Sequence, residues 1–452
     1  RVLFRSGRLS YAYDGKYMAE VNMGYNGSEN FAKGHRWGFF PSIALGYNIS
    51  EESFFEPLRK VITSMKLRGS WGLVGNDQIG GERFIYMPTI NLSGKGFTTG
   101  IDQNYGLSGP VYTRYENNSI TWEVGEKINL GIDLQLLNSL NIVVDIFRET
   151  RRDIFQKKGT IPTYLGTGNT DVFGNLAEMK NQGLDLSIDY NKAFSKDFYM
   201  NFKGTFTYAH NEITKYDEAP KYAFQSKVGQ SANVSQGYLS NGLFLDEAEI
   251  DRYNQQMGST LGAGDIKYLN VSNMHGYGDD IVDVDDWTWI GNPTVPEIVY
   301  GFGPSFKYKN WDFSFFFQGV AKTSLFMSGF HPFGDNSLRN VLQFVANDRW
   351  SPTNQNVDAK YPRLTRKTSL NNTNPGNSGR TSDYWMRDGS FLKLKNMELG
   401  YTFKRMRFYI SGSNLLTFSK FDLWDPEQGG GSGLKYPTQR VFNVGFQMTF
   451  NN

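Results

Sequence analysis

Apolar and polar residues alternate one by one along most of this chain, which is the periodicity of β-strands whose two faces meet different surroundings. Between 128 and 136 every second residue is apolar, and the residues between them are polar or glycine. The same alternation recurs in 184–190, 198–208 and 442–450. The strands that contain these segments are longer than the ~5–6 residues of ordinary globular strands and approach the ~9–11 residues that cross a bilayer. The pattern therefore predicts an all-β protein.

The connections between the predicted strands alternate between short and long. Short turns are expected at 14–16, 138–139, 191–197, 309–310 and 404–405. Long loops are expected at about 149–177, 211–297, 322–389 and 417–439. Outer-membrane barrels combine short periplasmic turns with long extracellular loops, whereas a soluble β-sandwich gives no reason to sort its loops by length. We therefore predict a transmembrane antiparallel up-and-down β-barrel with long extracellular loops.

The direction of the first strand bears on how complete this barrel is. The strand at 4–13 enters a short turn at Asp14-Gly15, so it starts at the long-loop end. Complete bacterial barrels have even strand numbers, and our count of about 13 is odd. We expect residues 1–452 to be the C-terminal portion of a larger barrel. In that case the strands at 4–13 and 440–451 lie apart or pair with other segments.

Composition narrows the remaining classes. The formal net charge is +2, which argues against a nucleic-acid-binding protein. Cysteine is absent, which excludes disulfides, thiolate metal sites and cysteine nucleophiles. Glycine (49 residues) and aromatic residues (15%) are abundant although only 39% of the chain is hydrophobic, which suits many strands joined by open loops. No apolar run of 18 or more residues occurs, so a transmembrane helix is excluded.

A series of short motifs, spread over nearly all 452 residues, identifies a family. They include Arg36 to Ser42, Lys66 to Gly72, Gly264-Asp265-Ile266-Lys267-Tyr268, Ile290 to Pro293, Tyr361-Pro362-Arg363-Leu364, Arg387 to Asn396, Gly412 to Leu415 and Asp425-Pro426-Glu427. In this order they resemble the C-terminal part of SusC/RagA-type TonB-dependent transporters from Bacteroidetes outer membranes.

The resemblance implies a probable 22-stranded barrel, with a plug domain and a TonB box that are absent from this chain. It also implies import of a glycan or peptide rather than catalysis, energised through TonB-ExbB-ExbD by way of the missing N-terminal part. A SusD-like surface lipoprotein is expected to close the outer mouth, docking among 149–177, 211–297 and 322–389. The location implied is the outer membrane of a Gram-negative bacterium, in contact with its lipid. Two alternatives stay open, a passive outer-membrane porin and a secreted all-β glycan-binding protein or glycosidase.

An acidic stretch provides the clearest constellation of candidate ligands. Asp279, Asp280, Asp283 and Asp285 are spaced as carboxylates on a loop that could hold Ca²⁺. Relatives often carry a calcium-like Asp-x-Asn-Gly-Asp-Gly-x-Ile motif here, but this chain has Asn270 at the first position and a stretched spacing. The alternative is an acidic loop without a metal. The four histidines show no ligand spacing for zinc.

Aromatic residues divide into two groups. Those near strand ends, such as Trp122, Tyr190, Trp311 and Tyr401, are predicted to form girdles at the membrane interface or to face lipid. The loop aromatics are candidates for substrate binding, although packing of the loops and contact with the lid explain them better: Tyr164, Tyr222, Tyr238, Trp287, Trp289, Trp350, Trp385 and Trp424. Short loop helices are expected at 246–256 and 337–350, and the run 429–433 is expected to be a flexible loop tip.

Overall fold

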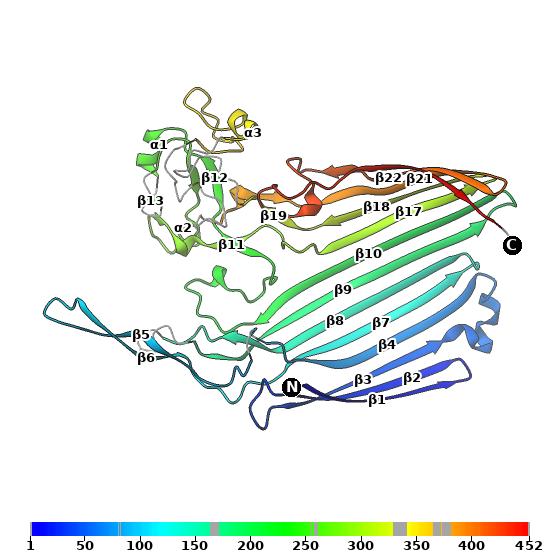
Figure 1. Ribbon diagram of the computed structural model, residues 1–452, viewed down its shortest axis with the longest axis horizontal. Coiled ribbons are helices and arrows are strands. Elements are labelled where there is room, and N and C mark those ends of the chain that lie inside the picture. The colour runs from blue at the N-terminus through cyan, green and yellow to red at the C-terminus, as the bar shows by residue number, and fades with distance from the viewer. Residues whose placement is uncertain are drawn as a thin grey trace. The chain divides into compact units, whose positions relative to one another are not determined.

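The computed structural model describes residues 2–79, 81, 83–162, 171–253, 255–256, 261–328, 341–364, 372 and 381–450. Thirteen of the strands in this part of the chain belong to one large sheet and follow one another in sequence order. They are β1 (Val2–Tyr13), β2 (Tyr17–Ser28), β3 (Trp37–Asn48), β4 (Ile62–Asn76), β7 (Glu123–Leu136), β8 (Leu140–Lys157), β9 (Phe173–Ala193), β10 (Phe198–Lys215), β17 (Ile298–Tyr308), β18 (Trp311–Ala321), β21 (Phe391–Phe403), β22 (Met406–Ser419) and β23 (Val441–Met448). This up-and-down order confirms the predicted topology (Figure 1).

The chain reverses its direction at the predicted short turns. β1 and β2 pair from Tyr13–Tyr17 outward, and Asp14 and Gly15 between them both have positive φ. Lys309 and Lys404 take the same left-handed conformation between β17 and β18 and between β21 and β22. Positive φ in a short loop gives the twist that matches a β-hairpin. Each turn thereby sets the antiparallel register of its two strands.

The chain divides into two compact units. The first contains residues 1–191, 207–220 and 226–232. Within it, β1-β2-β3-β4-β7-β8-β9 pair in order, and a separate hairpin is formed by β5 (Thr89–Thr99) and β6 (Tyr105–Arg114). The connection 77–122 that carries this hairpin was not among the predicted long loops. Two short 3₁₀ helices, η1 (Ile49–Glu51) and η2 (Ser53–Leu58), lie between β3 and β4.

Trp122 corrects one prediction about the aromatic residues of this unit. It is 5% exposed and packs with Phe31 and Phe40 in a small core, and its Nε1 donates to the Arg36 carbonyl oxygen at 3.2 Å. The assignment of Trp122 to a girdle or to the lipid face is therefore wrong, because position near a strand end does not reveal that the residue is buried in a core. Trp311, by contrast, is half exposed and lies against Tyr401 with ring centroids 4.7 Å apart.

The second unit contains residues 192–206, 221–225 and 233–452. Its long strands β17-β18-β21-β22-β23 pair in order. The long connections of this unit fold together at one end of these strands (Figure 1), and we call their described residues in 221–225, 233–297, 322–389 and 420–439 the loop body. Its strands pair as β11 (Ser235–Gly237) with β16 (Thr288–Ile290), β12 (Ser240–Leu243) with β14 (Ile266–Tyr268), β13 (Gln255–Gln256) with β15 (Ile281–Val282), and β19 (Ser324–Phe326) with β20 (Met386–Asp388).

Short helices complete the loop body: α1 (Glu247–Arg252), α2 (Val271–Met274), α3 (Gln343–Asn347), and the 3₁₀ helices η4 (Ala223–Gln225), η5 (Val284–Asp286), η6 (Asp383–Trp385) and η7 (Pro426–Gln428). The helix expected at 246–256 is present but ends at Arg252, and that expected at 337–350 is observed as α3, although 337–340 lie outside the described residues. No helix in the described ranges is long and apolar enough to span a membrane.

The two faces of the long strands differ as the alternation predicts. Leu130 on β7 is 63% exposed, and its cross-strand partner Ile146 on β8 is 59% exposed. In β23, Phe442, Val444 and Phe446 are likewise exposed. The other face carries polar groups such as Arg68, which donates to Asp133 and Asp145 at 2.8–3.0 Å. Apolar side chains exposed along successive strands are the outer surface expected of a membrane barrel.

Candidate functional site

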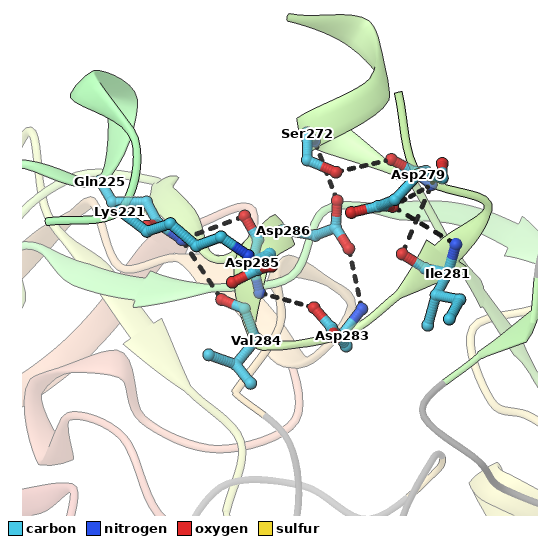
Figure 2. A network of polar contacts seen from close by, with 10 residues as sticks. Lys221, Gln225, Ser272, Asp279, Ile281, Asp283, Val284, Asp285 and Asp286 are labelled. Atoms are coloured by element: carbon cyan, nitrogen blue, oxygen red, sulfur yellow. Dashed lines mark hydrogen bonds and ion pairs between the residues drawn. The ribbon is translucent and has the colours of Figure 1, made fainter. Parts of the chain in front are cut away.

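The acidic stretch of the loop body folds as a hydrogen-bonded turn. Asp283 caps η5 through a reciprocal pair: its Oδ1 accepts from the Asp285 N–H at 2.8 Å, while its own N–H donates to Asp286 Oδ2 at 2.8 Å. Asp286 is fully buried and also accepts from the Ser272 N–H at 2.9 Å (Figure 2). Burial is the main reason that the pKa of Asp286 is raised above its ordinary value. The backbone N–H groups of Ser272 and Asp283 thus each donate to one oxygen of this carboxylate.

Asn270 explains why the chain departs from the calcium-like motif. Its Nδ2 donates to the Asp279 carbonyl oxygen at 2.8 Å and to Asp279 Oδ1 at 3.2 Å. Its Oδ1 accepts from the Asn273 N–H at 2.8 Å and caps α2. A carboxylate at position 270 could not donate these bonds and would repel Asp279. The Asn270 side-chain amide therefore holds the turn together by hydrogen bonds. An aspartate at this position would need a cation to offset its charge.

The segment that carries η4 supplies the remaining partners. The Lys221 ammonium group pairs with the Asp285 carboxylate, which raises the pKa of Lys221. Gln225 Nε2 donates to the Asp285 carbonyl oxygen at 3.0 Å (Figure 2). Lys221 and Gln225 therefore fasten this segment to the acidic turn by one ion pair and by hydrogen bonds.

The acidic side chains do not converge on one point where the predicted Ca²⁺ ion could bind. Asp279, Asp283 and Asp285 direct their carboxylates at different N–H groups and at Lys221, and Asp280 is exposed. Within the described ranges, no group of three or more His, Asp or Glu side chains is placed to hold a metal. A Ca²⁺ site needs six to eight oxygen ligands around one point. The arrangement does not fit a cation, and it favours the alternative of an acidic loop compensated by hydrogen bonds.

The predicted loop aromatics occupy two kinds of environment. Tyr238, Trp350 and Trp385 are 0–5% exposed and belong to the core of the loop body, against which Trp424 also packs. Tyr222, Trp287 and Trp289 are at least partly exposed, and the Tyr222 ring lies 4.2 Å from that of Tyr277. Tyr164 lies outside the described residues. Burial of the first group is what the packing interpretation requires, and the second group keeps surface that a ligand or partner could contact.

An ion pair that the sequence did not predict joins two of the family motifs. Arg363 Nε and Nη2 donate to the two oxygens of Asp265 at 2.5 and 3.1 Å, and the Asp265 side chain is fully buried. Asn372 Nδ2 adds a bond to Asp265 Oδ1 at 2.6 Å, and Asn372 Oδ1 accepts from the Ile266 N–H. One motif contains an aspartate and the other an arginine. The presence of both motifs in the chain was the only signal in the sequence that could have suggested the Asp265–Arg363 ion pair.

A second unpredicted network joins the start of β21 to the loop after β22. The Lys393 ammonium group, 1% exposed, pairs with Asp425 and donates to Glu427 Oε2 at 2.9 Å. Lys395 donates to Glu427 Oε1 at 2.7 Å. Asp425 in addition accepts from the Glu427 N–H and caps η7. The loop is thereby anchored to the large sheet by four charges.

Comparison with known proteins identifies the class. Residues 6–415 match the family model for the β-barrel of TonB-dependent receptor-like proteins, so the chain belongs to that family. Barrels of this family lie in the outer membrane of Gram-negative bacteria. The match confirms the barrel prediction.

Particular relatives support the resemblance to SusC and RagA. The chain is 27% identical over 481 residues to TonB-dependent receptor P3 of Formosa agariphila, and 28% identical over 471 residues to TonB-dependent receptor SusC of Bacteroides thetaiotaomicron. Each alignment covers 98% of this chain but only 45% and 43% of the relative, so the chain spans less than half their length. The RagAB peptide transporter structure matches with a TM-score of 0.71 at 20% identity, over 99% of this chain and 48% of that one, which shows a shared fold.

Proposed function

We propose that this chain forms the later barrel wall and the outer loops of a TonB-dependent importer of glycans or peptides in a Bacteroidetes outer membrane. The observation that carries the proposal is the combination of a family barrel sheet with long loops that fold into a body with its own buried core. Loops that only connected strands would need no such core. The chain performs no covalent chemistry in this proposal, since the barrel and its loops bind and admit cargo.

The rest of the importer belongs to residues outside this chain. SusC and the other relatives are more than twice as long as the matched region. We assign the plug, the TonB box and the contact with TonB-ExbB-ExbD to the part that precedes residue 1. Import then requires that energy from TonB displaces the plug, while this chain supplies the wall past which the cargo moves.

The lid is a SusD-like surface lipoprotein, and one stretch of the loop body is suited to receive it. Five large apolar side chains within fourteen residues are exposed: Met274 (70%), Tyr277 (51%), Ile281 (44%), Val284 (65%) and Trp287 (37%). Exposed apolar side chains concentrated in one short segment, beside polar groups, favour a protein interface. Lys221 and the acidic turn provide those polar groups. We call residues 274–287 the lid-docking patch.

Gentle extraction of the whole importer from native membranes tests this function. We expect a lipoprotein to co-purify in near-equal amount, and Ile281→Asp with Val284→Asp to release it, because charges in the centre of an interface are costly. Leu245→Asp, at an exposed site on the loop body outside the patch, is the matched control and should retain the lipoprotein. Repeated recovery of the barrel alone from wild-type membranes contradicts the proposal.

A further inference from the structure

The connection between β3 and β4 differs from its neighbours at the same end of the sheet. It runs from 49 to 61 and contains η1 and η2, whereas the β1–β2 and β7–β8 turns have three residues each (Figure 1). The Asn48 N–H donates to the Lys16 carbonyl oxygen of the first turn at 2.7 Å. The Leu137 N–H of the second turn donates to the Val61 carbonyl oxygen at 2.9 Å. Because short turns mark the periplasmic end of an outer-membrane barrel, this connection lies on the periplasmic side.

Glu52 fastens the connection to the face of the sheet that meets lipid. Its Oε1 accepts from the Tyr17 hydroxyl at 2.7 Å and from the Tyr47 hydroxyl at 3.4 Å, and the two tyrosine rings are stacked with centroids 5.2 Å apart. By the period of two, Tyr47 shares its face of β3 with Ile43 and Leu45, which are 41% and 57% exposed. Tyrosines at the end of such a face are typical of the membrane interface. Glu52 therefore lies at the level of that interface.

Side-chain contacts fix the backbone of the connection. Arg59 Nε and Nη2 both donate to the Ser50 carbonyl oxygen, at 2.9 and 2.5 Å. Ser50 Oγ donates to Asn48 Oδ1 at 2.7 Å, and the Phe55 side chain is buried. Residues 49–61 are therefore a defined structure, and the exposure of their other side chains follows from where this structure places them.

Three apolar side chains of this structure are exposed. Phe54 is 67%, Leu58 51% and Val61 57% exposed, and Leu137 of the neighbouring turn is also exposed. Two residues of chain span at most about 7 Å, so Phe54 lies close to the tyrosine pair that Glu52 contacts. The apolar surface of the strands therefore continues beyond the strand ends into this connection.

This continuity indicates a phospholipid surface as the occupant, because the tyrosine pair meets the membrane interface whenever the barrel is embedded. Segments that lie in such an interface combine aromatic and aliphatic side chains with basic residues that reach the headgroups. Arg59 and Lys60 are exposed beside Phe54 and Leu58 and supply these basic groups.

We propose that residues 49–61 form an interfacial anchor, which inserts Phe54, Leu58 and Val61 among the headgroups of the phospholipid leaflet on the periplasmic side. Glu52 fastens the anchor to the barrel through its two tyrosine partners. The inference goes beyond the proposed import function, since it depends only on the place of the barrel in the outer membrane and on neither the cargo nor the lipoprotein. Such an anchor opposes movement of this end of the barrel along the membrane normal.

Fluorescence quenching in lipid nanodiscs tests the anchor. The chain contains no cysteine, so Phe54→Cys or Leu58→Cys places a single nitrobenzoxadiazole label in it. The whole importer with its lipoprotein is studied in nanodiscs of phosphatidylethanolamine and phosphatidylglycerol, and the unmutated importer gives the background from cysteines outside residues 1–452. We expect blue-shifted emission, loss of fluorescence when a phospholipid with a nitroxide near its headgroup is included, and little quenching by aqueous iodide.

Glu56→Cys is the matched control, since Glu56 is exposed on the same segment and its charge favours water. Its label should be quenched by iodide. Adding Glu52→Ala to Phe54→Cys should reduce the quenching by lipid, because the tyrosine contacts are lost. Adding Glu51→Ala should not, because Glu51 is exposed and its only ion pair, with Arg59 among the described residues, spans 3.9 Å.

Two results at the apolar positions would overturn the anchor. Quenching by iodide but not by lipid would place the segment in water, and protection from both quenchers would mean that protein covers it. Equal quenching by lipid in the Glu52→Ala and Glu51→Ala variants would overturn the role given to Glu52. Heat-modifiable migration on gels ensures that only folded barrels are compared. None of these results depends on transport or on recovery of the lipoprotein, so the importer function is tested separately.

Discussion

The Arg363 guanidinium donates two hydrogen bonds to the buried Asp265 carboxylate, at 2.5 and 3.1 Å, although 98 residues separate the two in sequence. The pair joins the segment that leads into β14 to the segment that follows α3. Both segments contribute to one core, through Ile266 and Tyr361. The ion pair and the apolar core therefore hold the loop body together as one unit.

Loss of this pair should open the loop body. Arg363→Ala leaves the Asp265 charge buried without its partner, which costs about 3–5 kcal/mol for buried pairs. We expect hydrogen exchange of 261–268 and 361–364 to accelerate strongly in this variant. Lys360→Ala is the control, because the Lys360–Asp348 pair is exposed at 3.6 Å and such pairs contribute at most about 1 kcal/mol. Equal exchange in both variants would show that the Asp265–Arg363 pair does not hold the body together.

The anchor at Lys393 should make the loop 420–439 sensitive to acid. Burial raises the pKa values of Asp425 and Glu427, but the hydrogen bonds and charges of Lys393 and Lys395 lower them by a larger amount. Both pKa values therefore lie below their ordinary values. Carboxyls of this kind stabilise the folded state above their unfolded pKa values of about 4, and the contribution is lost as pH falls through the lower folded values. Protease cleavage of this loop should therefore be constant from pH 7 to 5 and rise below about pH 4.

Lys393→Met should remove the protection of this loop already at pH 7, because it leaves two carboxylates without their buried partner. Lys420→Met changes a lysine that is 87% exposed and should behave as wild type. A loop that stays protected at pH 7 in Lys393→Met argues against the anchor.

Chelation should leave the acidic turn unchanged. Asp283 and Asp286 are compensated by backbone N–H groups, and Asp285 is compensated by Lys221. We expect elemental analysis to find no stoichiometric calcium, and proteolysis of 270–290 to be the same with and without EDTA. Asn270→Asp should increase the cleavage, because a carboxylate would face Asp279 without the amide donor. Bound calcium in wild type would reinstate the cation site.

A charged side chain on the apolar face of the sheet should destabilise the folded barrel. Leu130→Arg places a charge on the exposed face between neighbours such as Ile146, at a cost of about 2–4 kcal/mol if the site lies at the bilayer midplane. Asn129→Arg, on the opposite face of the same strand, should cost far less. The folded fraction after refolding into lipid, measured by heat-modifiable migration, compares them. Similar losses for both would contradict the assignment of faces.

The strands could be predicted because their signal is local. A period of two fixes which side of β7 carries Leu130, and Asp14-Gly15 marks a turn without knowledge of distant residues. The loop body could not be predicted because its contacts link distant segments without any period, as Asp265 with Arg363 and Ser240 with Asp383 do. The prediction for Trp122 was wrong for the same reason, since its partners Phe31 and Phe40 lie more than eighty residues away in sequence. The Ca²⁺ prediction relied on the number of acidic residues in the turn. A single side chain, the amide of Asn270, changes the chemistry of that turn.

A cryo-electron microscopy structure of the complex extracted from the native outer membrane tests the central claim most directly. The account predicts that this chain forms part of one larger barrel that encloses a plug. It also predicts that a lipoprotein lies over residues 274–287, and that β1 and β23 pair with strands from outside this chain. A small barrel closed by direct pairing of β1 with β23, with an open interior and no lipoprotein, would contradict it.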